Sequence, residues 1–244
     1  MNPEPLLLVP GLMCDHAVWA PLLPALAGQR PCAVVDHGDA DSLPEMARRL
    51  LRQAPPRFAL AGHSMGARVV LEALRQAPDR ITRVALLDTG YLARAAGAAG
   101  EEEAGKRQAL LAIARRDGVR AMAREWVQGM VHPARLKDIP LIESILAMFD
   151  RKSADDFERQ IRALLNRPDA TEVLRGLQVP TLILCGRQDG WAPVPQHEAM
   201  HALAPGSVLS VVDDAGHMAP MERPEAVMAP LTEWLAVPEP ATTH

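Results

Sequence analysis

The sequence predicts an α/β fold, in which a mostly parallel sheet of about six strands is flanked by helices and carries a helical insertion. Three observations lead to this prediction. Short apolar runs without polar alternation are typical of strands that are buried on both faces. These runs alternate with segments whose apolar residues recur every three or four positions, as in repeated strand–helix units. A long stretch between the fourth and fifth runs carries only the helical pattern.

The strands and core helices follow in a regular order. Six apolar runs are expected to form the strands: Leu6–Val9, Cys32–Asp36, Phe58–Ala61, Val84–Asp88, Thr181–Cys185 and Val208–Val212. Helical periodicity predicts three core helices: Leu43–Gln53, Met65–Gln76 and Pro224–Leu235. The Pro- and Thr-rich residues 237–244 are expected to form a flexible tail.

The insertion has a different composition, because Ala, Arg, Glu and Met dominate it and β-branched runs vanish. Four helices are predicted there: Glu101–Arg115, Val119–Met130, Pro140–Phe149 and Ala154–Leu165. We therefore divide the chain into a core, residues 1–91 and 169–244, and an all-helical insertion, residues 92–168.

Composition limits the classes of function. The 244 residues suit one large domain with an insertion, and 48% hydrophobic with 23% charged residues exclude wholesale disorder. A net charge of −4 without a basic block, and only 3% aromatic residues, argue against nucleic acid or a membrane surface as a partner.

Cysteine usage and the N-terminus indicate the compartment. Cys14, Cys32 and Cys185 lack the spacing of a redox or zinc site, so we expect reduced thiols. The N-terminal segment has no positively charged region before its short apolar run, and no stretch is long enough to span a membrane. These features predict a cytoplasmic protein.

The segment Gly62-His63-Ser64-Met65-Gly66 matches the G-x-S-x-G motif and lies between a predicted strand and a predicted helix, as that motif requires. A sharp turn there exposes the serine hydroxyl above the sheet, and a Cβ at either glycine would collide with a neighbouring element. The N–H groups at the start of the following helix favour developing negative charge. The motif predicts Ser64 as a nucleophile; the alternative is a tight turn with an idle serine.

Over nearly its whole length the chain resembles the α/β-hydrolase superfamily, and most of all its esterase and lactonase members. The resemblance is carried, in the family's order, by LLLVPGLMCDHAVW, AGHSMGARVVLEAL, TLILCGRQDGWAPV and VVDDAGHMAPMERPEAV. It implies helices on both faces of the sheet. It also implies a helical cap after the strand Val84–Asp88, where the insertion lies.

The resemblance assigns the partners of Ser64. His217, in the loop after the last strand, would be the general base, since a neutral imidazole can take the hydroxyl proton and return it to a leaving group. Asp189, after the fifth strand, would orient His217, and Asp88 is its rival. Three other histidines and two other acids fit these roles less well by position: His16, His63, His132, Asp213 and Asp214.

The resemblance also implies an oxyanion hole formed by the backbone N–H groups of Leu12 and Met65. Two positions depart from the family's pattern. Pro10 stands where a loop-bracing histidine is common, and Ala67 stands where a further glycine is common. Neither change removes a backbone donor, so we expect the oxyanion hole to form.

A zinc motif competes with this interpretation, because residues 197–201 read H-E-x-x-H. The predicted helix ends at Pro205-Gly206, without the histidine that would supply a third ligand. In the family an outer helix lies here, away from the cleft. We therefore interpret His197 and His201 as part of a solvated helix face, and we expect neither metal nor organic cofactor.

Side chains of the cap and of the loops after the strands are candidates for the substrate pocket: Trp126, Met130, Phe149, Trp191 and Met218. Eleven arginines load the cap: Arg94, Arg107, Arg115, Arg116, Arg120, Arg124, Arg135, Arg151, Arg159, Arg162 and Arg167. Interleaved acids favour solvated faces for most of them. One or two that face the cleft could hold a substrate carboxylate.

The sequence thus predicts a serine hydrolase that cleaves a small or medium carboxylic ester, thioester or lactone through an acyl-enzyme on Ser64. Two alternatives stay open. One is other serine-triad chemistry, such as carbon–carbon bond hydrolysis or a cofactor-free lyase reaction; the other is a receptor-like binding module with a weakly active triad. The expected partner is a small-molecule ester, and the oligomeric state stays open.

Overall fold

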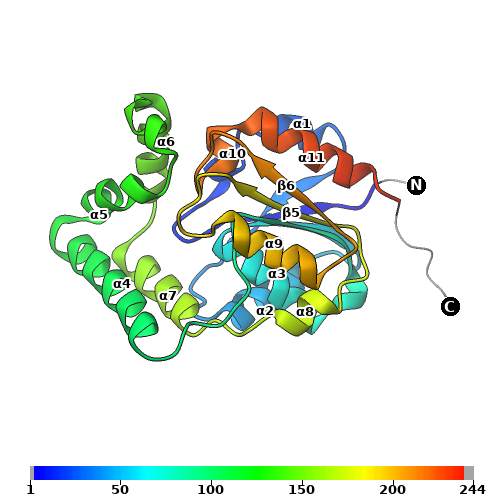
Figure 1. Ribbon diagram of the computed structural model, residues 1–244, viewed down its shortest axis with the longest axis horizontal. Helices are drawn as coiled ribbons and strands as arrows, with labels where there is room; N and C mark the ends of the chain where they lie inside the picture. The colour runs from blue at the N-terminus through cyan, green and yellow to red at the C-terminus, as the bar shows by residue number, and fades with distance from the viewer. Residues whose placement is uncertain (1–2, 239–244) are drawn as a thin grey trace.

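The computed structural model describes residues 3–238. Its strands form one parallel six-stranded sheet in the order β2-β1-β3-β4-β5-β6 (Figure 1). The strands are β1 (Leu6–Val9), β2 (Cys32–Val34), β3 (Phe58–His63), β4 (Ile81–Leu87), β5 (Thr181–Gly186) and β6 (Ser207–Val212). The predicted fold class is confirmed, although β4 begins earlier than expected, at Ile81.

Helices cover both faces of the sheet (Figure 1). One face carries α1 (Leu23–Ala27), α10 (Ala219–Glu222) and α11 (Pro224–Ala236), and the other carries α2 (Leu43–Gln53), α3 (Met65–Gln76), α8 (Thr171–Arg175) and α9 (Val194–Leu203). Helices α2 and α3 match their predictions residue for residue. Short 3-10 helices lie in the connections: His16–Val18, Pro78–Arg80, Val127–Gly129 and Pro133–Lys137.

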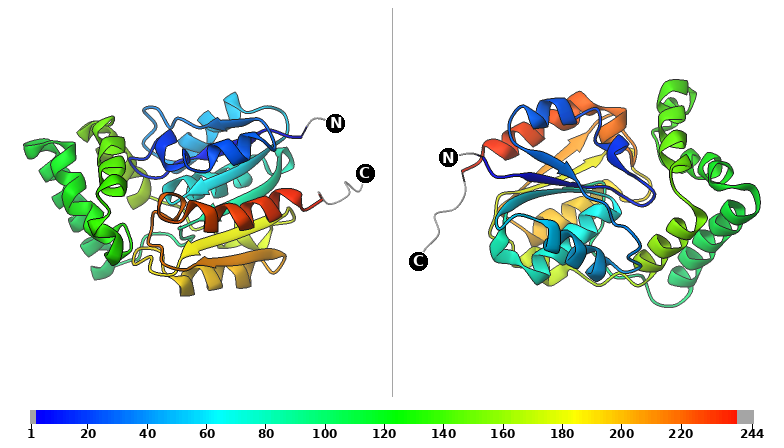
Figure 2. Two further views of the ribbon diagram at one scale, coloured as in Figure 1. Left: turned by 90° about the horizontal axis from the view of Figure 1, so that it is seen from above. Right: turned by 180° about the vertical axis from the view of Figure 1, so that it is seen from behind.

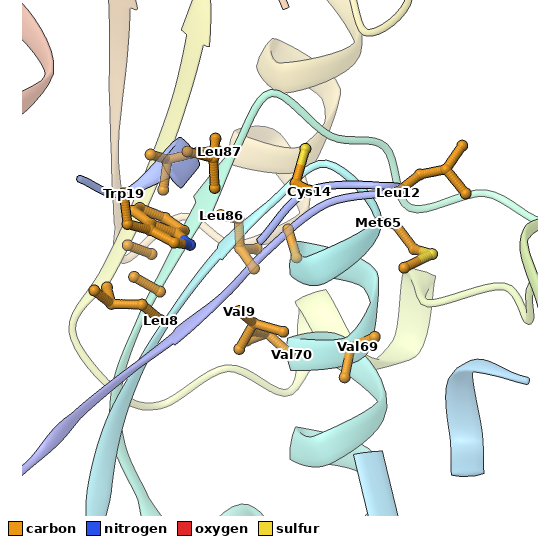
Figure 3. Packing of buried hydrophobic residues seen from close by; sticks show 14 of the residues in the cluster. Leu8, Val9, Leu12, Cys14, Trp19, Met65, Val69, Val70, Leu86 and Leu87 are labelled. Atoms are coloured by element: carbon orange, nitrogen blue, oxygen red, sulfur yellow. The ribbon is translucent and has the colours of Figure 1, made fainter. Parts of the chain in front are cut away.

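The core lies between the sheet and these helices. Strands β3 and β4 are buried at every residue, which explains why their sequences show no polar alternation. In Figure 3, Val9 of β1 and Val70 of α3 lie within one cluster of buried hydrophobic side chains. This packing fixes the start of α3 against the carboxyl end of β1.

The cap, defined here as residues 92–168, holds α4 (Ala98–Asp117), α5 (Val119–Trp126), α6 (Ile139–Asp150) and α7 (Ala154–Leu165). These helices lie to one side of the sheet, beyond the carboxyl ends of its strands (Figure 2). The ring of Trp126 packs edge-on against Phe149 and Phe157, with centroids 5.7 and 5.5 Å apart, and so joins α5, α6 and α7. The second predicted cap helix ends earlier than expected, at Trp126.

The last described residues of the chain are held against the sheet. Arg83 donates to the carbonyl oxygen of Val237 at 2.9 Å, whereas residues 239–244 of the predicted tail lie outside the described residues. Cys14, Cys32 and Cys185 are free thiols. Over residues 3–238, no helix has the length and apolar character needed to cross a membrane.

Candidate active site

Ser64 occupies the turn between β3 and α3 in a strained conformation. Its backbone angles, φ 54° and ψ −118°, define a conformation that residues other than glycine rarely adopt. A Cβ on Gly62 would come within 2.5 Å of the backbone of Ala67, and one on Gly66 within 2.1 Å of the carbonyl oxygen of Val9. The strand can therefore turn at once into the helix only because both positions are glycine.

Ser64, His217 and Asp189 form one chain of hydrogen bonds. Nε2 of His217 lies 2.8 Å from Oγ of Ser64, and Nδ1 lies 2.7 Å from Oδ2 of Asp189. The other carboxylate oxygen of Asp189 accepts from the N–H groups of Trp191 and Ala192 at 2.8 and 2.9 Å. Because the carboxylate accepts a hydrogen bond from Nδ1–H of His217, Nε2 carries no proton and can accept from the serine hydroxyl.

The surroundings keep Asp189 ionised. Burial by itself would raise the pKa of this carboxyl, but the adjacent His217 and the two backbone N–H donors hold the pKa below its ordinary value of 3.8. A carboxylate in this place can stabilise the imidazolium that forms when His217 takes a proton.

Asp88, the rival acid, lies deeper and does not contact His217. Its Oδ1 accepts from the N–H of Gly186 at 2.9 Å, while Oδ2 is 3.8 Å from Nε2 of His63. Burial, and then the charge of Asp189, raise the pKa of Asp88 well above its ordinary value. The geometry therefore favours Asp189 as the partner of His217.

The backbone of His217 is held from two sides. Its carbonyl oxygen accepts from Nε2 of His63 at 2.8 Å, and its N–H donates to the carbonyl oxygen of Met130 in the cap at 2.8 Å. Burial lowers the pKa of His63 to about 3, so this ring is neutral and donates from Nε2. His63 therefore supports the histidine loop through the backbone of His217.

Glu222, at the end of α10, clamps the same loop. Its Oε1 accepts from the N–H groups of Gly216 and Met218, which flank His217, at 2.9 and 3.2 Å. Its Oε2 accepts from the N–H of His132 in the cap at 2.8 Å. One buried carboxylate thus links the histidine loop to the cap. The sequence analysis missed this residue, because no local pattern shows that its carboxylate reaches the backbone of His132, 90 residues away in the chain.

The predicted oxyanion residues line the same cavity as Ser64. Met65 is the first residue of α3, where a backbone N–H has no acceptor within the helix. Leu12 lies in a loop whose next residue, Met13, has a φ of 60° and donates its N–H to Oε1 of Gln160 at 2.7 Å. Gln160 belongs to α7, so the cap holds this loop in place.

The loop is also braced where the family's usual histidine is missing. Nε2 of His37 lies 2.9 Å from the carbonyl oxygen of Pro10, and Arg151 of the cap pairs with Asp15 at 2.6 Å. No local sequence pattern pointed to His37 or Gln160, because both act over a long sequence separation.

A cavity of about 380 Å³ opens above Ser64. Four of the five predicted pocket residues line it: Trp126, Met130, Trp191 and Met218. The rings of Trp126 and Trp191 stack with their centroids 5.3 Å apart, and the centroid of the Trp191 ring lies 4.9 Å from that of His217. Phe149 does not line the cavity; it is fully buried behind Trp126, because α6 packs its apolar face into the cap.

The interpretation of the H-E-x-x-H segment as a solvated helix face is wrong for His197. This side chain is fully buried, its Nε2 accepts from the N–H of Thr89 at 3.0 Å, and its Nδ1 lies 3.3 Å from the carbonyl oxygen of Pro193. The start of α9 packs behind the site, where burial lowers the pKa of His197 to about 4. In the described part of the chain, His, Cys, Asp and Glu side chains form no group of three that could hold a metal ion.

A parallel sheet with helices on both faces, and a serine at a strained strand–helix turn beside a buried histidine and aspartate, define a class of hydrolytic enzymes. Residues 6–229 match the pattern of the alpha/beta hydrolase family, and the chain belongs to that family. Its homologues include hydrolases and esterases.

Two curated relatives illustrate the range of the family. The chain is 31% identical over 243 residues to the dihydrolipoyllysine-residue acetyltransferase component of the acetoin cleaving system of Pseudomonas putida. The matched region covers 91% of this chain but only 61% of the length of that protein. It is 28% identical to the pimeloyl-(acyl-carrier protein) methyl ester esterase of Photobacterium profundum, over 94% of each chain.

Solved structures agree in fold. A thermophilic esterase from Thermogutta terrifontis superposes with a TM-score of 0.82 and 27% identity, over 96% of this chain and 90% of that one. An enol-lactonase from Burkholderia xenovorans has a TM-score of 0.83 at 21% identity, over 97% and 93% of the two chains, and it supports the fold alone.

Proposed function

We propose that this protein is a serine hydrolase that cleaves small or medium carboxylic esters through an acyl-enzyme on Ser64. The observation that carries the proposal is the continuous hydrogen-bonded chain from Oγ of Ser64 through His217 to Asp189. The likeness to an esterase at 27% identity and to a methyl ester esterase at 28% identity supports the same activity.

In the proposed reaction, Oγ of Ser64 attacks the ester carbonyl carbon while its proton passes to Nε2 of His217. The N–H groups of Leu12 and Met65 stabilise the negative oxygen of the tetrahedral intermediate. The alcohol then leaves with the proton from His217. Water attacks the acyl carbon, gives a proton to His217 and releases the carboxylic acid, and the serine hydroxyl is restored.

The test is turnover of a short 4-nitrophenyl ester by the wild type and by Ser64→Ala. We expect a fall in kcat/KM of about 10³-fold or more in the variant, with unchanged circular dichroism. Full esterase activity in Ser64→Ala would rule out the proposed nucleophile.

The same experiment separates the alternatives. A wild-type protein that a fluorophosphonate labels at Ser64 but that turns over no ester would favour a receptor-like module. Thioesters and lactones of matched acyl length, assayed in parallel, define the preferred bond. We also propose the cytoplasm as the compartment, which fractionation of cells that produce the protein would test.

A further inference from the structure

Arg68 places a cation inside the cavity that contains Ser64. It lies four residues after Ser64 on α3, so the two side chains are about one helical turn apart, and both line the cavity. Nη1 donates to the carbonyl oxygen of Leu92 at 3.0 Å, and Nη2 lies close to Gly90, where a Cβ would be 2.9 Å from it. Among residues 3–238, Arg68 forms no ion pair with a carboxylate.

Two further guanidinium groups, from the cap, line the same cavity. Arg107 and Arg167 share one carboxylate, that of Glu103, with N–O distances of 3.0 Å for Arg107 and 2.7 Å for Arg167. We call Arg68, Glu103, Arg107 and Arg167 the arginine wall. Three positive charges against one negative charge leave this wall with a net charge of +2.

Asp169, an exposed carboxylate outside the cavity lining, also acts on Arg68, but its single negative charge does not cancel this excess. The guanidinium groups of Arg167 and Arg107 hold the pKa of Glu103 at about 2, although burial alone would raise it. Glu103 is therefore ionised and supplies the one negative charge of the arginine wall. Burial, and then the charge of Arg167, lower the pKa of Arg68 to about 9, which leaves it protonated at neutral pH.

The remaining charged groups on the cavity lining do not change this balance. Asp88 contributes little negative charge, because burial raises its pKa well above 3.8. Lys106 pairs with Glu102 at 2.7 Å on the exposed face of α4. A partly desolvated cation without an anion is unfavourable, and an anionic ligand would relieve that cost.

The other lining side chains are mainly apolar: Leu110, Trp126, Met130, Leu164, Trp191 and Met218. The cavity thus combines a nucleophile, an apolar lining and a cationic wall. This arrangement fits a molecule with an ester at one end, an apolar connecting chain and an anion at the other end. A planar guanidinium matches a carboxylate through two parallel hydrogen bonds, which gives direction as well as charge.

Building on the proposed esterase activity, we propose that the arginine wall is a subsite for a carboxylate of the substrate, so that the preferred substrates are half-esters of dicarboxylic acids. The ester carbonyl lies at Ser64 and the free carboxylate lies at Arg68. Arg68 is then a specificity-determining residue.

The test compares two esters of equal acyl length, mono-(4-nitrophenyl) adipate and 4-nitrophenyl hexanoate, with Ser64→Ala as the background. We expect the wild type to favour the adipate ester by about 10- to 100-fold in kcat/KM, mostly through KM. Arg68→Met should remove most of this preference. Arg68→Lys, which keeps the positive charge but cannot form two parallel hydrogen bonds to a carboxylate, should remove part of it.

The matched control is Arg115→Met. Arg115 lies on α4, outside the cavity lining, and pairs with Glu158 at 2.6 Å. This variant should keep the wild-type preference. Equal kcat/KM values for the two esters in the wild type, or a preference that survives Arg68→Met, would overturn the subsite.

A binding experiment separates failure of the subsite from failure of the esterase proposal. If the wild type hydrolyses neither ester, the esterase proposal fails, and calorimetric titration of Ser64→Ala with adipate tests the subsite. Binding that is lost in the Ser64→Ala/Arg68→Met double variant supports the subsite; no binding to Ser64→Ala refutes it. If Arg68→Met does not fold, Arg68→Lys and competitive inhibition of the wild type by adipate make the same comparison.

Discussion

Replacement of Glu222 by glutamine tests whether one carboxylate ties the histidine loop to the cap. In the wild type its two oxygens accept three backbone N–H groups, from His132, Gly216 and Met218. An amide offers one oxygen. The favoured orientation keeps that oxygen on Gly216 and Met218, and it turns the NH2 group toward the N–H of His132.

The magnitude follows from this count of donors. One buried N–H without an acceptor costs about 1–3 kcal/mol. For a chain of this length each kcal/mol shifts Tm by about 2–4 °C, so Glu222→Gln should lower Tm by about 2–12 °C. Because the two bonds that flank His217 survive, kcat should fall less in Glu222→Gln than in Glu222→Ala, which loses all three acceptors.

The assay is thermal unfolding followed by circular dichroism, together with kcat on a neutral 4-nitrophenyl ester. Glu225→Gln is the control, because Glu225 is exposed on the first turn of α11, and its effect should stay within about 0.5 kcal/mol. A Tm for Glu222→Gln within about 1 °C of the wild type would show that the Glu222 carboxylate does not stabilise the contact between the histidine loop and the cap.

Three further predictions follow from the same structure. His197 is neutral when folded, with its pKa lowered from 6.5 to about 4, so its stabilising effect is complete above pH 6.5 and is lost as the pH falls toward 4. Urea unfolding should therefore show about 2 kcal/mol less stability from this residue at pH 5 than at pH 7, and His197→Gln should flatten that slope. Asp189→Asn should lower kcat/KM by about 10⁴-fold, because an amide cannot hold the same tautomer of His217; a loss below tenfold would show that another acid serves. Gly66→Ala should prevent folding, since its Cβ would lie 2.1 Å from a carbonyl oxygen, whereas Gly105→Ala, with no atom within 4 Å of its Cβ, should raise Tm.

The fold was predictable because its signals are local. Strands buried on both faces require continuous apolar runs, and α2 and α3 show their buried faces as apolar residues at helical spacing. The turn at Ser64 was predictable for the same reason, because two glycines within five residues meet a steric demand set by adjacent elements. The positions of His217 and Asp189 came from a resemblance, not from spacing.

The errors arose where contacts join distant parts of the chain. Phe149 has the periodicity of a helix residue, but only the packing of α6 against α5 decided that it lies behind Trp126 and outside the cavity. His197 is polar and lies on a helix, so its local pattern indicated solvent. Its burial depends on the loop after β4, because Nε2 of His197 accepts a hydrogen bond from the N–H of Thr89 in that loop.

By itself the sequence determined the parallel sheet, the helical insertion and the strained serine turn, because each depends on the steric and hydrophobic character of neighbouring residues. Only the tertiary structure decided which charges meet. Arg68 of α3 and the cap pair Arg107 and Arg167 are far apart in the chain, yet they line one cavity with Ser64. Electrostatic interactions depend on distance and burial in three dimensions, and no residue pattern along the chain records either quantity.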